Sequence, residues 1–253
     1  MNNPEQFFEY AHNYTTALHT TKWRVSLTTQ SASDAANTLL GDVGEGGRLY
    51  VEDGAFHAAR GLLGLYGPFQ NDRTRRATDL IECYELPRRG ASDMRDILTS
   101  LTPLEGDEEA LAHLNRAVRA NSIVIVQTIS NSVWNGCASG YFLIELGRLL
   151  RARQSRLIVD ETLTAVRTGS LWSFEHVPGF VPDGVIFGKG IGISGIAVPQ
   201  NKPMKTEHVT LPVHPCALYM TKKRMRAIHV WLRASAARAK QFLRARTFVE
   251  NVH

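Results

Sequence analysis

Three polar residues stand where apolar runs of the sequence end, and their side chains suit acid–base or covalent chemistry. Gln127, Asp160 and Lys189 each end or closely follow a run rich in Val and Ile. A carboxylate pairs with a protonated nitrogen, and a neutral lysine amine attacks a carbonyl carbon. An unpaired charge is costly to bury, so Asp160 and Lys189 each need a partner, unless they are ordinary strand-end charges that face the solvent.

The elements that carry these residues form a regular pattern in the second half of the chain. Short apolar runs at 121–129, 155–161 and 183–189 predict strands, and 140–153 predicts a helix between the first two. Strands that are apolar on both faces and alternate with helices indicate a parallel sheet covered on both sides. We therefore expect an α/β, three-layer sandwich with a mostly parallel central sheet, and ligands beyond the carboxyl ends of its strands.

The first half is less regular. Residues 5–20 and 108–120 have helical periodicity, whereas 23–28 and 48–51 resemble strands. The stretch 68–103 is polar and weakly periodic, which predicts irregular connections.

Length and composition favour one large domain over 1–253, with an amino-terminal helix and first strand in 1–30 and a basic terminal helix region in 216–253. The chain has 253 residues, of which 43% are hydrophobic and 21% charged, enough for a sizeable core. No apolar run reaches the ~18 residues of a membrane span. The start of the sequence does not resemble a secretory signal, so we expect a cytoplasmic protein with no membrane partner.

The cysteines and the charge give no specific site. Cys83, Cys137 and Cys216 lie far apart, which argues against a disulfide framework or a metal site. The net charge of +5 comes mostly from 221–246, where apolar residues recur at helical spacing between the basic ones. This pattern is typical of a surface helix with a solvated basic face; a nucleic-acid interface is the less favoured alternative.

The segment from Leu157 to Gly192 resembles the class III aminotransferases, which are pyridoxal-phosphate enzymes of fold type I. The matching residues are Asp160, Glu161, Thr164, Arg167, Thr168, Gly169, Glu175, His176, Pro182, Asp183, Lys189, Gly190 and Gly192. The resemblance implies that Lys189 forms the internal aldimine with the cofactor aldehyde and that Asp160 pairs with the protonated pyridine nitrogen. That pairing makes the ring an electron sink, and burial of Lys189 beside the ring would favour the neutral amine.

The resemblance extends to residues that would bind the rest of the cofactor. Ser31, Ala32 and Ser33 occupy the positions of the loop that holds the cofactor phosphate at a helix amino terminus. Phe56 and His57 resemble the family's aromatic–His pair, whose ring stacks on the pyridine.

Thr210, in the segment 210–215, resembles a threonine that reaches the cofactor phosphate of the neighbouring subunit. This match implies a homodimer.

Several features depart from the family. Its members are much longer, so the small domain that completes the substrate pocket is expected to be largely absent. Gln127 replaces a glutamate, Ala32 replaces a glycine of the phosphate loop, and Leu163 replaces a glutamine that approaches the cofactor phenolic oxygen.

Two functions are compatible with this sequence. The first is an aminotransferase that moves an amino group between an amino acid or amine and an oxo acid, with racemase or aminomutase chemistry also open. The second is a truncated, catalytically impaired homologue that binds cofactor or a partner chain supplying the missing part of the pocket.

Overall fold

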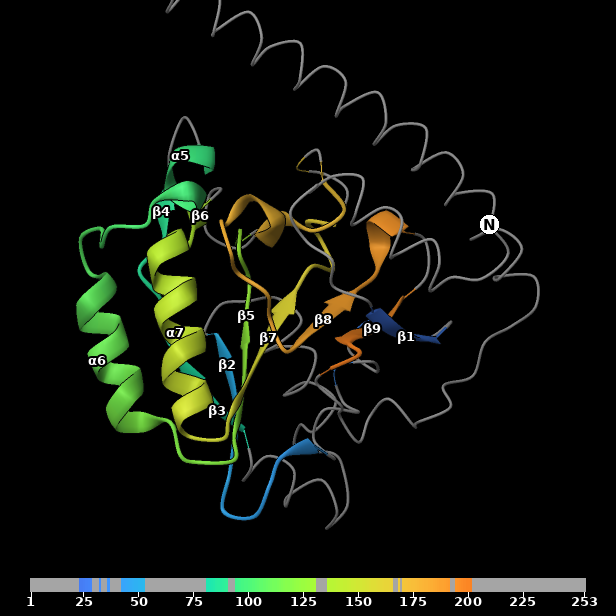
Figure 1. Cartoon of the computed structure of the whole chain (residues 1–253), viewed down its shortest axis with the longest axis horizontal. Coiled ribbons are helices and arrows are strands. Elements are labelled where there is room, and N and C mark those ends of the chain that lie inside the picture. Colours follow the sequence, from blue (N-terminus) through green and yellow to red (C-terminus); the bar gives the residue numbers. More distant parts are fainter. Residues whose placement is uncertain are drawn as a thin grey trace, which may run out of the picture.

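A computed structural model describes residues 23–28, 32, 36, 42–52, 81–90, 94–130, 136–165, 168, 170–191 and 194–201. Its centre is a seven-stranded sheet with the order β1-β9-β8-β7-β5-β2-β3 (Figure 1). The strands are β1 (Trp23–Thr28), β2 (Leu49–Glu52), β3 (Ile81–Tyr84), β5 (Ile123–Val126), β7 (Arg156–Asp160), β8 (Gly184–Phe187) and β9 (Ser194–Pro199).

The sheet is mostly parallel. Neighbours from β3 through β2, β5 and β7 to β8 pair in parallel, whereas β9 is antiparallel to both β8 and β1. Strands β2, β5 and β8 are buried along their whole length, as expected for a sheet covered on both faces. The α/β class and the mostly parallel sheet are thus as the sequence predicts.

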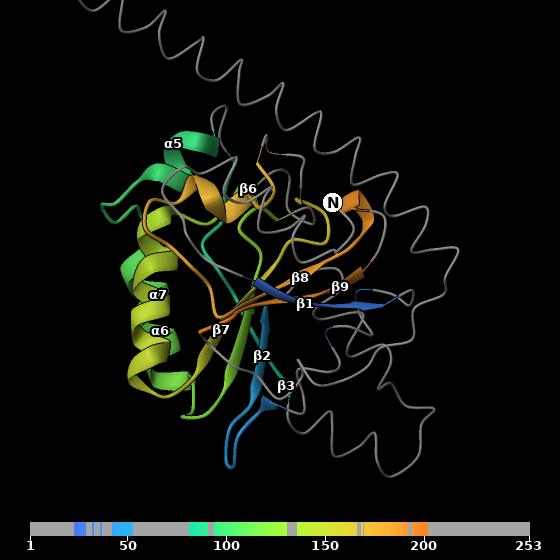
Figure 2. The ribbon, with the colours of Figure 1, turned by 45° about the vertical axis from the view of Figure 1, so that its right-hand side comes forward.

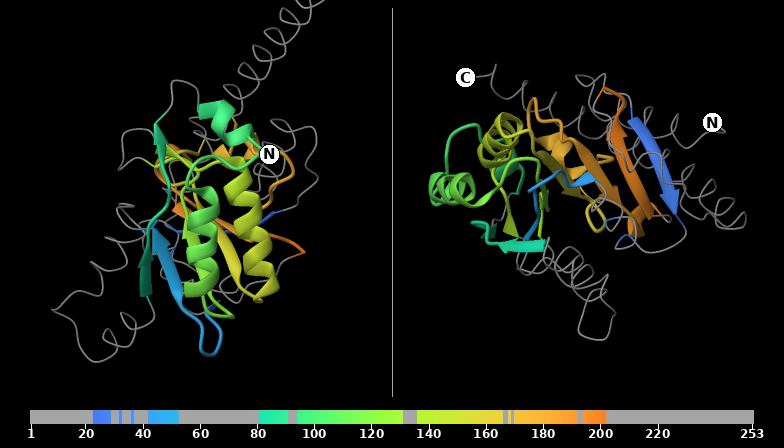
Figure 3. Two further views of the ribbon diagram at one scale, coloured as in Figure 1. Left: turned by 90° about the vertical axis from the view of Figure 1, so that its left-hand side faces the viewer. Right: turned by 90° about the horizontal axis from the view of Figure 1, so that it is seen from below.

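Helices cover one face of this sheet. α6 (Asp107–Ala117) and α7 (Gly140–Ala152) lie side by side over the middle of the sheet, and α5 (Met94–Thr99) lies near the amino-terminal end of α7 (Figures 1 and 3). The side chain of Ser139 caps α7 by accepting a hydrogen bond from the Phe142 amide at 3.0 Å. Gly140 is required there, because a Cβ atom would overlap the Leu98 carbonyl oxygen.

The two faces of the sheet bury separate apolar clusters. The helical face packs Val124, Val126 and Val159 against α5, α6 and α7, together with Trp23, Trp172 and Phe187. The opposite face packs Leu49, Val51, Ile123, Ile125, Ile158, Ile186, Ile196 and Val198 against Ala32 and Ala36, which are both helical. This alternation follows from the two-residue period of side chains along a strand.

The sequence predicted less of the structure between 68 and 103. The described part of this stretch contains β3, α5 and the short strand β4 (Arg89–Gly90), which pairs with β6 (Gly136–Cys137). The prediction of irregular connections was therefore wrong for these residues. Strand β9 was not predicted either. In the view of Figure 2, β9 lies between β8 and β1.

Candidate functional site

The carboxyl ends of three neighbouring strands bring Gln127, Asp160 and Lys189 to one edge of the sheet. The register pairs Val126 with Val159, so Gln127 follows β5 at the level where Asp160 ends β7. Asp160 in turn pairs with Ile186 of β8, and Lys189 comes three residues later in the chain. The parallel register thus brings the ends of β5, β7 and β8, which are neighbours in the sheet (Figure 1), to one level, as the sequence analysis expected.

Asp160 and Gln127 share the face of the sheet that carries Ala32. Ile158 and Ile125 belong to the apolar cluster that contains Ala32. Because side chains alternate along a strand, Asp160 and Gln127, each two residues further on, continue this face. Ala32, from the predicted phosphate loop, and Asp160, the predicted pyridine partner, therefore lie on one side of the sheet.

The turn after β7 fixes the carboxylate of Asp160. This side chain is 2% exposed, and its Oδ1 atom accepts a hydrogen bond from the Thr162 amide at 2.9 Å. A carboxylate held by a backbone amide two residues on has little rotational freedom. The turn that follows β7 therefore fixes the orientation of the Asp160 carboxylate.

Gly188 directly precedes Lys189 and lies next to Ala32, the phosphate-loop position. A Cβ atom at Gly188 would lie 3.1 Å from Ser194 Oγ, 3.3 Å from Thr162 Cγ2 and 3.4 Å from Ala32 Cβ. Residues from three parts of the chain thus converge around this glycine, and a side chain here would compete for their space.

Lys189 follows at once, in the short helix η3 (Lys189–Ile191), with a φ of 27°. Positive φ is uncommon for a residue other than glycine, and Asn121 and Gln154 also adopt it in this chain. The side chain of Lys189 is exposed. The burial that the sequence analysis expected for this amine is therefore not observed.

Glu161 points to the opposite, helical face, where it organises a buried network. Its Oε1 atom accepts hydrogen bonds from Ser173 Oγ at 2.6 Å and from the Phe174 amide at 3.2 Å. The Thr164 hydroxyl donates to Oε2, and Thr128 Oγ1 lies 3.4 Å from Oε1. Complete burial raises the pKa of Glu161 to about 7, although hydrogen bonds from Ser173 and Thr164 act in the other direction.

A buried ion pair, which the sequence analysis missed, supports the turn after β5. The side chains of Arg88 and Glu52 are 6% and 5% exposed, and Arg88 Nε lies 2.6 Å from Glu52 Oε1. Arg88 also donates to the Thr128 carbonyl at 3.2 Å, while Glu52 Oε2 accepts from the Gln127 amide at 3.4 Å. Glu52, like Asp160, ends a buried strand, and this position could have marked it as a buried carboxylate that needs a partner. Nothing in the sequence indicated that Arg88 would be that partner.

The remaining predicted residues lie outside the described part of the chain. These are Ser31, Ser33, Phe56, His57 and Thr210, together with the basic segment 216–253.

The described residues fit pyridoxal phosphate. Gln127 Oε1 and Thr162 Oγ1 are buried and find no hydrogen-bond partner among the described residues, so polar atoms close to Asp160 are left to bind a ligand. Asp160 supplies the carboxylate that a pyridinium requires, and Lys189 supplies the primary amine that an aldehyde requires. In the same described ranges, no group of three or more His, Cys, Asp or Glu residues could hold a metal ion.

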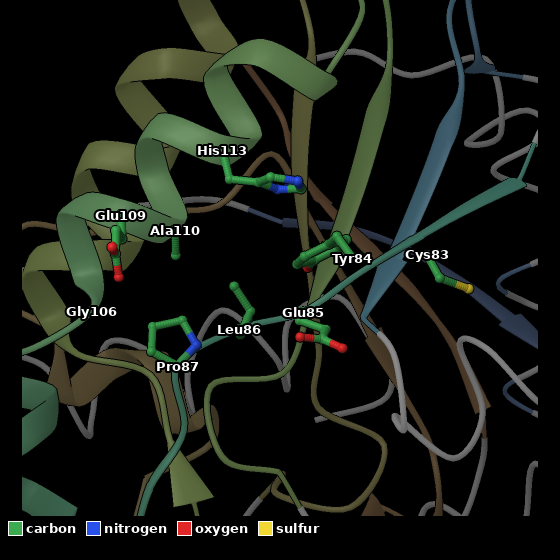
Figure 4. A pocket seen from close by; sticks show the side chains of 9 residues that line it. All are labelled: Cys83, Tyr84, Glu85, Leu86, Pro87, Gly106, Glu109, Ala110 and His113. Atoms are coloured by element: carbon green, nitrogen blue, oxygen red, sulfur yellow. The ribbon is translucent and has the colours of Figure 1, made fainter.

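A separate groove lies beside β3, the edge strand farthest from β1. It has a volume of about 600 Å³ and runs between the end of β3 and α6, with Glu85, Glu109 and His113 in its lining (Figure 4). None of the strand-end candidates lines it.

The fold resembles that of solved aminotransferases. A Bacillus anthracis aminotransferase matches with a TM-score of 0.59 at 16% identity, over 95% of this chain and 58% of that one. The Toxoplasma gondii ornithine aminotransferase has a TM-score of 0.57 at 16% identity (89% and 51%), and a Bacillus megaterium S-selective transaminase has 0.58 at 14% (84% and 52%). The chain thus spans about half the length of these structures.

Sequence comparison alone finds no such likeness, because no protein-family model and no curated protein matches the chain. At these identities the structural likeness establishes the fold.

Within the described residues, no helix is both long and apolar enough to span a bilayer.

Proposed function

We propose that this protein binds pyridoxal phosphate at the carboxyl edge of the sheet and transfers an amino group between an amino acid or amine and an oxo acid. The observation that carries the proposal is that Ala32 and Thr162 both approach Gly188, the residue before Lys189, on the face of the sheet that Asp160 continues. The structural likeness to aminotransferases supports the same reaction class.

Each residue has a distinct task in this proposal. The backbone around Ala32, at a helical segment, binds the phosphate, with Ser31 and Ser33 beside it. Asp160 keeps the pyridine nitrogen protonated, and its orientation is preset by the Thr162 amide. When bound, the cofactor supplies an electron sink for the electrons of the substrate Cα–H bond. Lys189 would hold the cofactor through its primary amine, and the same amine, when free and neutral, would accept the proton from the substrate Cα.

Other parts of the proposal rest on the sequence. Phe56 and His57 are assigned to the ring face of the cofactor, and Thr210 to the phosphate of a neighbouring subunit in a homodimer. A cytoplasmic location is part of the same proposal.

Reductive trapping tests the lysine. The purified chain is mixed with pyridoxal phosphate, reduced with borohydride and mapped by peptide mass spectrometry. We expect one modified peptide, carrying the label at Lys189, and an absorption band that Lys189→Ala removes. Because Lys189 is exposed, this variant is expected to fold, and Lys189→Arg is the matched variant that keeps the charge. Label spread over several surface lysines would contradict the assignment.

Asp160→Asn tests the electron sink separately. The amide keeps the size of the side chain and an oxygen for the Thr162 amide, but it lacks the charge that holds the pyridine proton. We expect cofactor binding to be weakened and amino transfer to be lost. An unchanged transfer rate would refute the role given to Asp160.

A second candidate is a subunit that binds the cofactor or a partner chain without catalysis. Leu163 favours it, because an apolar side chain stands where the resemblance places a hydrogen-bonding glutamine. A single-turnover assay separates the two functions. In it, an amino donor added to the loaded chain changes the cofactor spectrum only if amino transfer occurs. Trapping at Lys189 without any such change, over a panel of amino acids and amines, would support the second candidate.

A further inference from the structure

Gln127 is a buried residue that directly follows β5. The residue is 3% exposed, and its Oε1 atom is buried without a hydrogen-bond partner among the described residues. Leaving a buried polar atom unsatisfied costs stability, so such an atom in a native fold calls for an explanation. A bound ligand is one.

The backbone at Gln127 is firmly held. Its amide donates to Glu52 Oε2 at 3.4 Å, and the following carbonyl, of Thr128, accepts from Arg88 at 3.2 Å. Glu52 and Arg88 are themselves paired and buried. They therefore restrain the backbone at Gln127, which sets the direction of the Gln127 side chain. The Gln127 carboxamide therefore stays on the Asp160 face of the sheet.

Gln127 and Ala32 lie on opposite sides of Asp160 within that face. Ala32 lies on the β8 side, since its Cβ atom would be 3.4 Å from a Cβ atom added at Gly188, which follows β8. Gln127 follows β5, which is the neighbour of β7 on the other side. Asp160, on β7, is between them.

Pyridoxal phosphate has the same order of groups. Its phosphate arm and its phenolic oxygen lie on opposite sides of the ring axis that joins the nitrogen to the aldehyde carbon. With the phosphate at Ala32 and the nitrogen at Asp160, the phenolic oxygen faces β5. We propose that the Gln127 carboxamide donates a hydrogen bond to this phenolic oxygen; this assignment rests on the proposed function.

The amide suits this oxygen chemically. Rotation of the carboxamide presents its NH₂ group where Oε1 now lies, and a neutral donor binds an ionised phenolic oxygen without adding a second negative charge beside Asp160. The hydrogen bond stabilises the ionised form of the bound chromophore, so its loss shifts the pH midpoint of the absorbance change upward.

Two variants of similar size test the assignment. Gln127→Met cannot donate at any pH, and Gln127→Glu can donate only when protonated. Gln200→Met is the matched control, because Gln200 is exposed and follows β9 at the opposite edge of the sheet. Three quantities are measured for each variant: the Kd for pyridoxal phosphate, the pH midpoint of the bound chromophore, and the Tm without cofactor.

We expect Gln127→Met to weaken cofactor binding about ten-fold and to raise the pH midpoint by about one unit, which corresponds to one hydrogen bond of ordinary strength. Without cofactor, its Tm stays equal or rises by about 2–4 °C, because an unsatisfied polar atom has been removed. Gln127→Glu loses affinity progressively as the pH rises through the titration of the new carboxyl. Gln200→Met behaves as the unmodified chain.

The outcomes separate the two levels of the proposal. Cofactor binding and pH midpoint unchanged in Gln127→Met would overturn the Gln127 assignment alone. A marked fall in its Tm without cofactor would also overturn it, because Gln127 would then be structural. Failure of the unmodified chain to bind pyridoxal phosphate would overturn the proposed function and this assignment with it.

Discussion

The free energy of unfolding should fall as the pH rises in the unmodified chain, because Glu161 ionises. In Glu161→Gln this contribution to the fall should be absent. Burial raises the pKa of Glu161 from 4.5 to about 7 in the folded chain. A carboxyl with a raised folded pKa contributes stability that is fully present below the unfolded value and lost as the pH rises through the folded value. The window of this effect is therefore pH 4.5 to 7.

The size of the effect follows from the shift. Each pH unit within the window changes the free energy of unfolding by about 1.4 kcal/mol, so the two units between pH 5 and 7 correspond to about 2–3 kcal/mol. Glutamine keeps an acceptor for Ser173 Oγ and the Phe174 amide, and its NH₂ group can donate to Thr164. The variant is therefore expected to fold and to lose only the ionisation.

Urea unfolding at pH 5, 6, 7 and 8 measures the effect. Relative to the unmodified chain, the variant should gain about 2–3 kcal/mol on going from pH 5 to pH 8. Groups common to both chains cancel in this difference. Glu108→Gln is the matched control, since Glu108 lies exposed on α6. A difference between variant and unmodified chain that does not change with pH would refute the reasoning.

Two further predictions concern the buried ion pair and the cysteines. Arg88→Ala leaves the carboxylate of Glu52 buried without its main partner, so we expect a loss of about 3–5 kcal/mol in urea unfolding. The double variant Arg88→Met/Glu52→Leu should recover most of this loss, and no recovery would mean that the pair itself stabilises the fold. In the native chain, an alkylating reagent should label the exposed Cys83 rapidly and Cys137 slowly, because Cys137 is buried and burial raises the pKa of its thiol. Peptide mass mapping reads both rates, and equal rates would contradict the described packing around β6.

The sequence by itself determined the parallel half of the fold and three positions of the candidate site. The apolar β-branched runs of β5, β7 and β8 and the helical period of α7 are local patterns. Such patterns can be seen in the sequence, because the spacing of residues along a strand or helix determines which face each side chain occupies. From these runs alone, Gln127, Asp160 and Lys189 could be expected at one edge.

Only the tertiary structure decided which strands pair and which side chains share a face. Strand β1 pairs with β9 although they come from opposite ends of the described chain, and such pairing over a long separation leaves no periodic signal. The same holds for Arg88 and Glu52, which meet because the segment between β3 and β4 approaches the end of β2. The sequence had marked Gln127 as the loss of a carboxylate. Its position beside Asp160 depends on the register of β5 against β7, which only the folded sheet fixes. Its side-chain oxygen is buried there without a hydrogen-bond partner among the described residues.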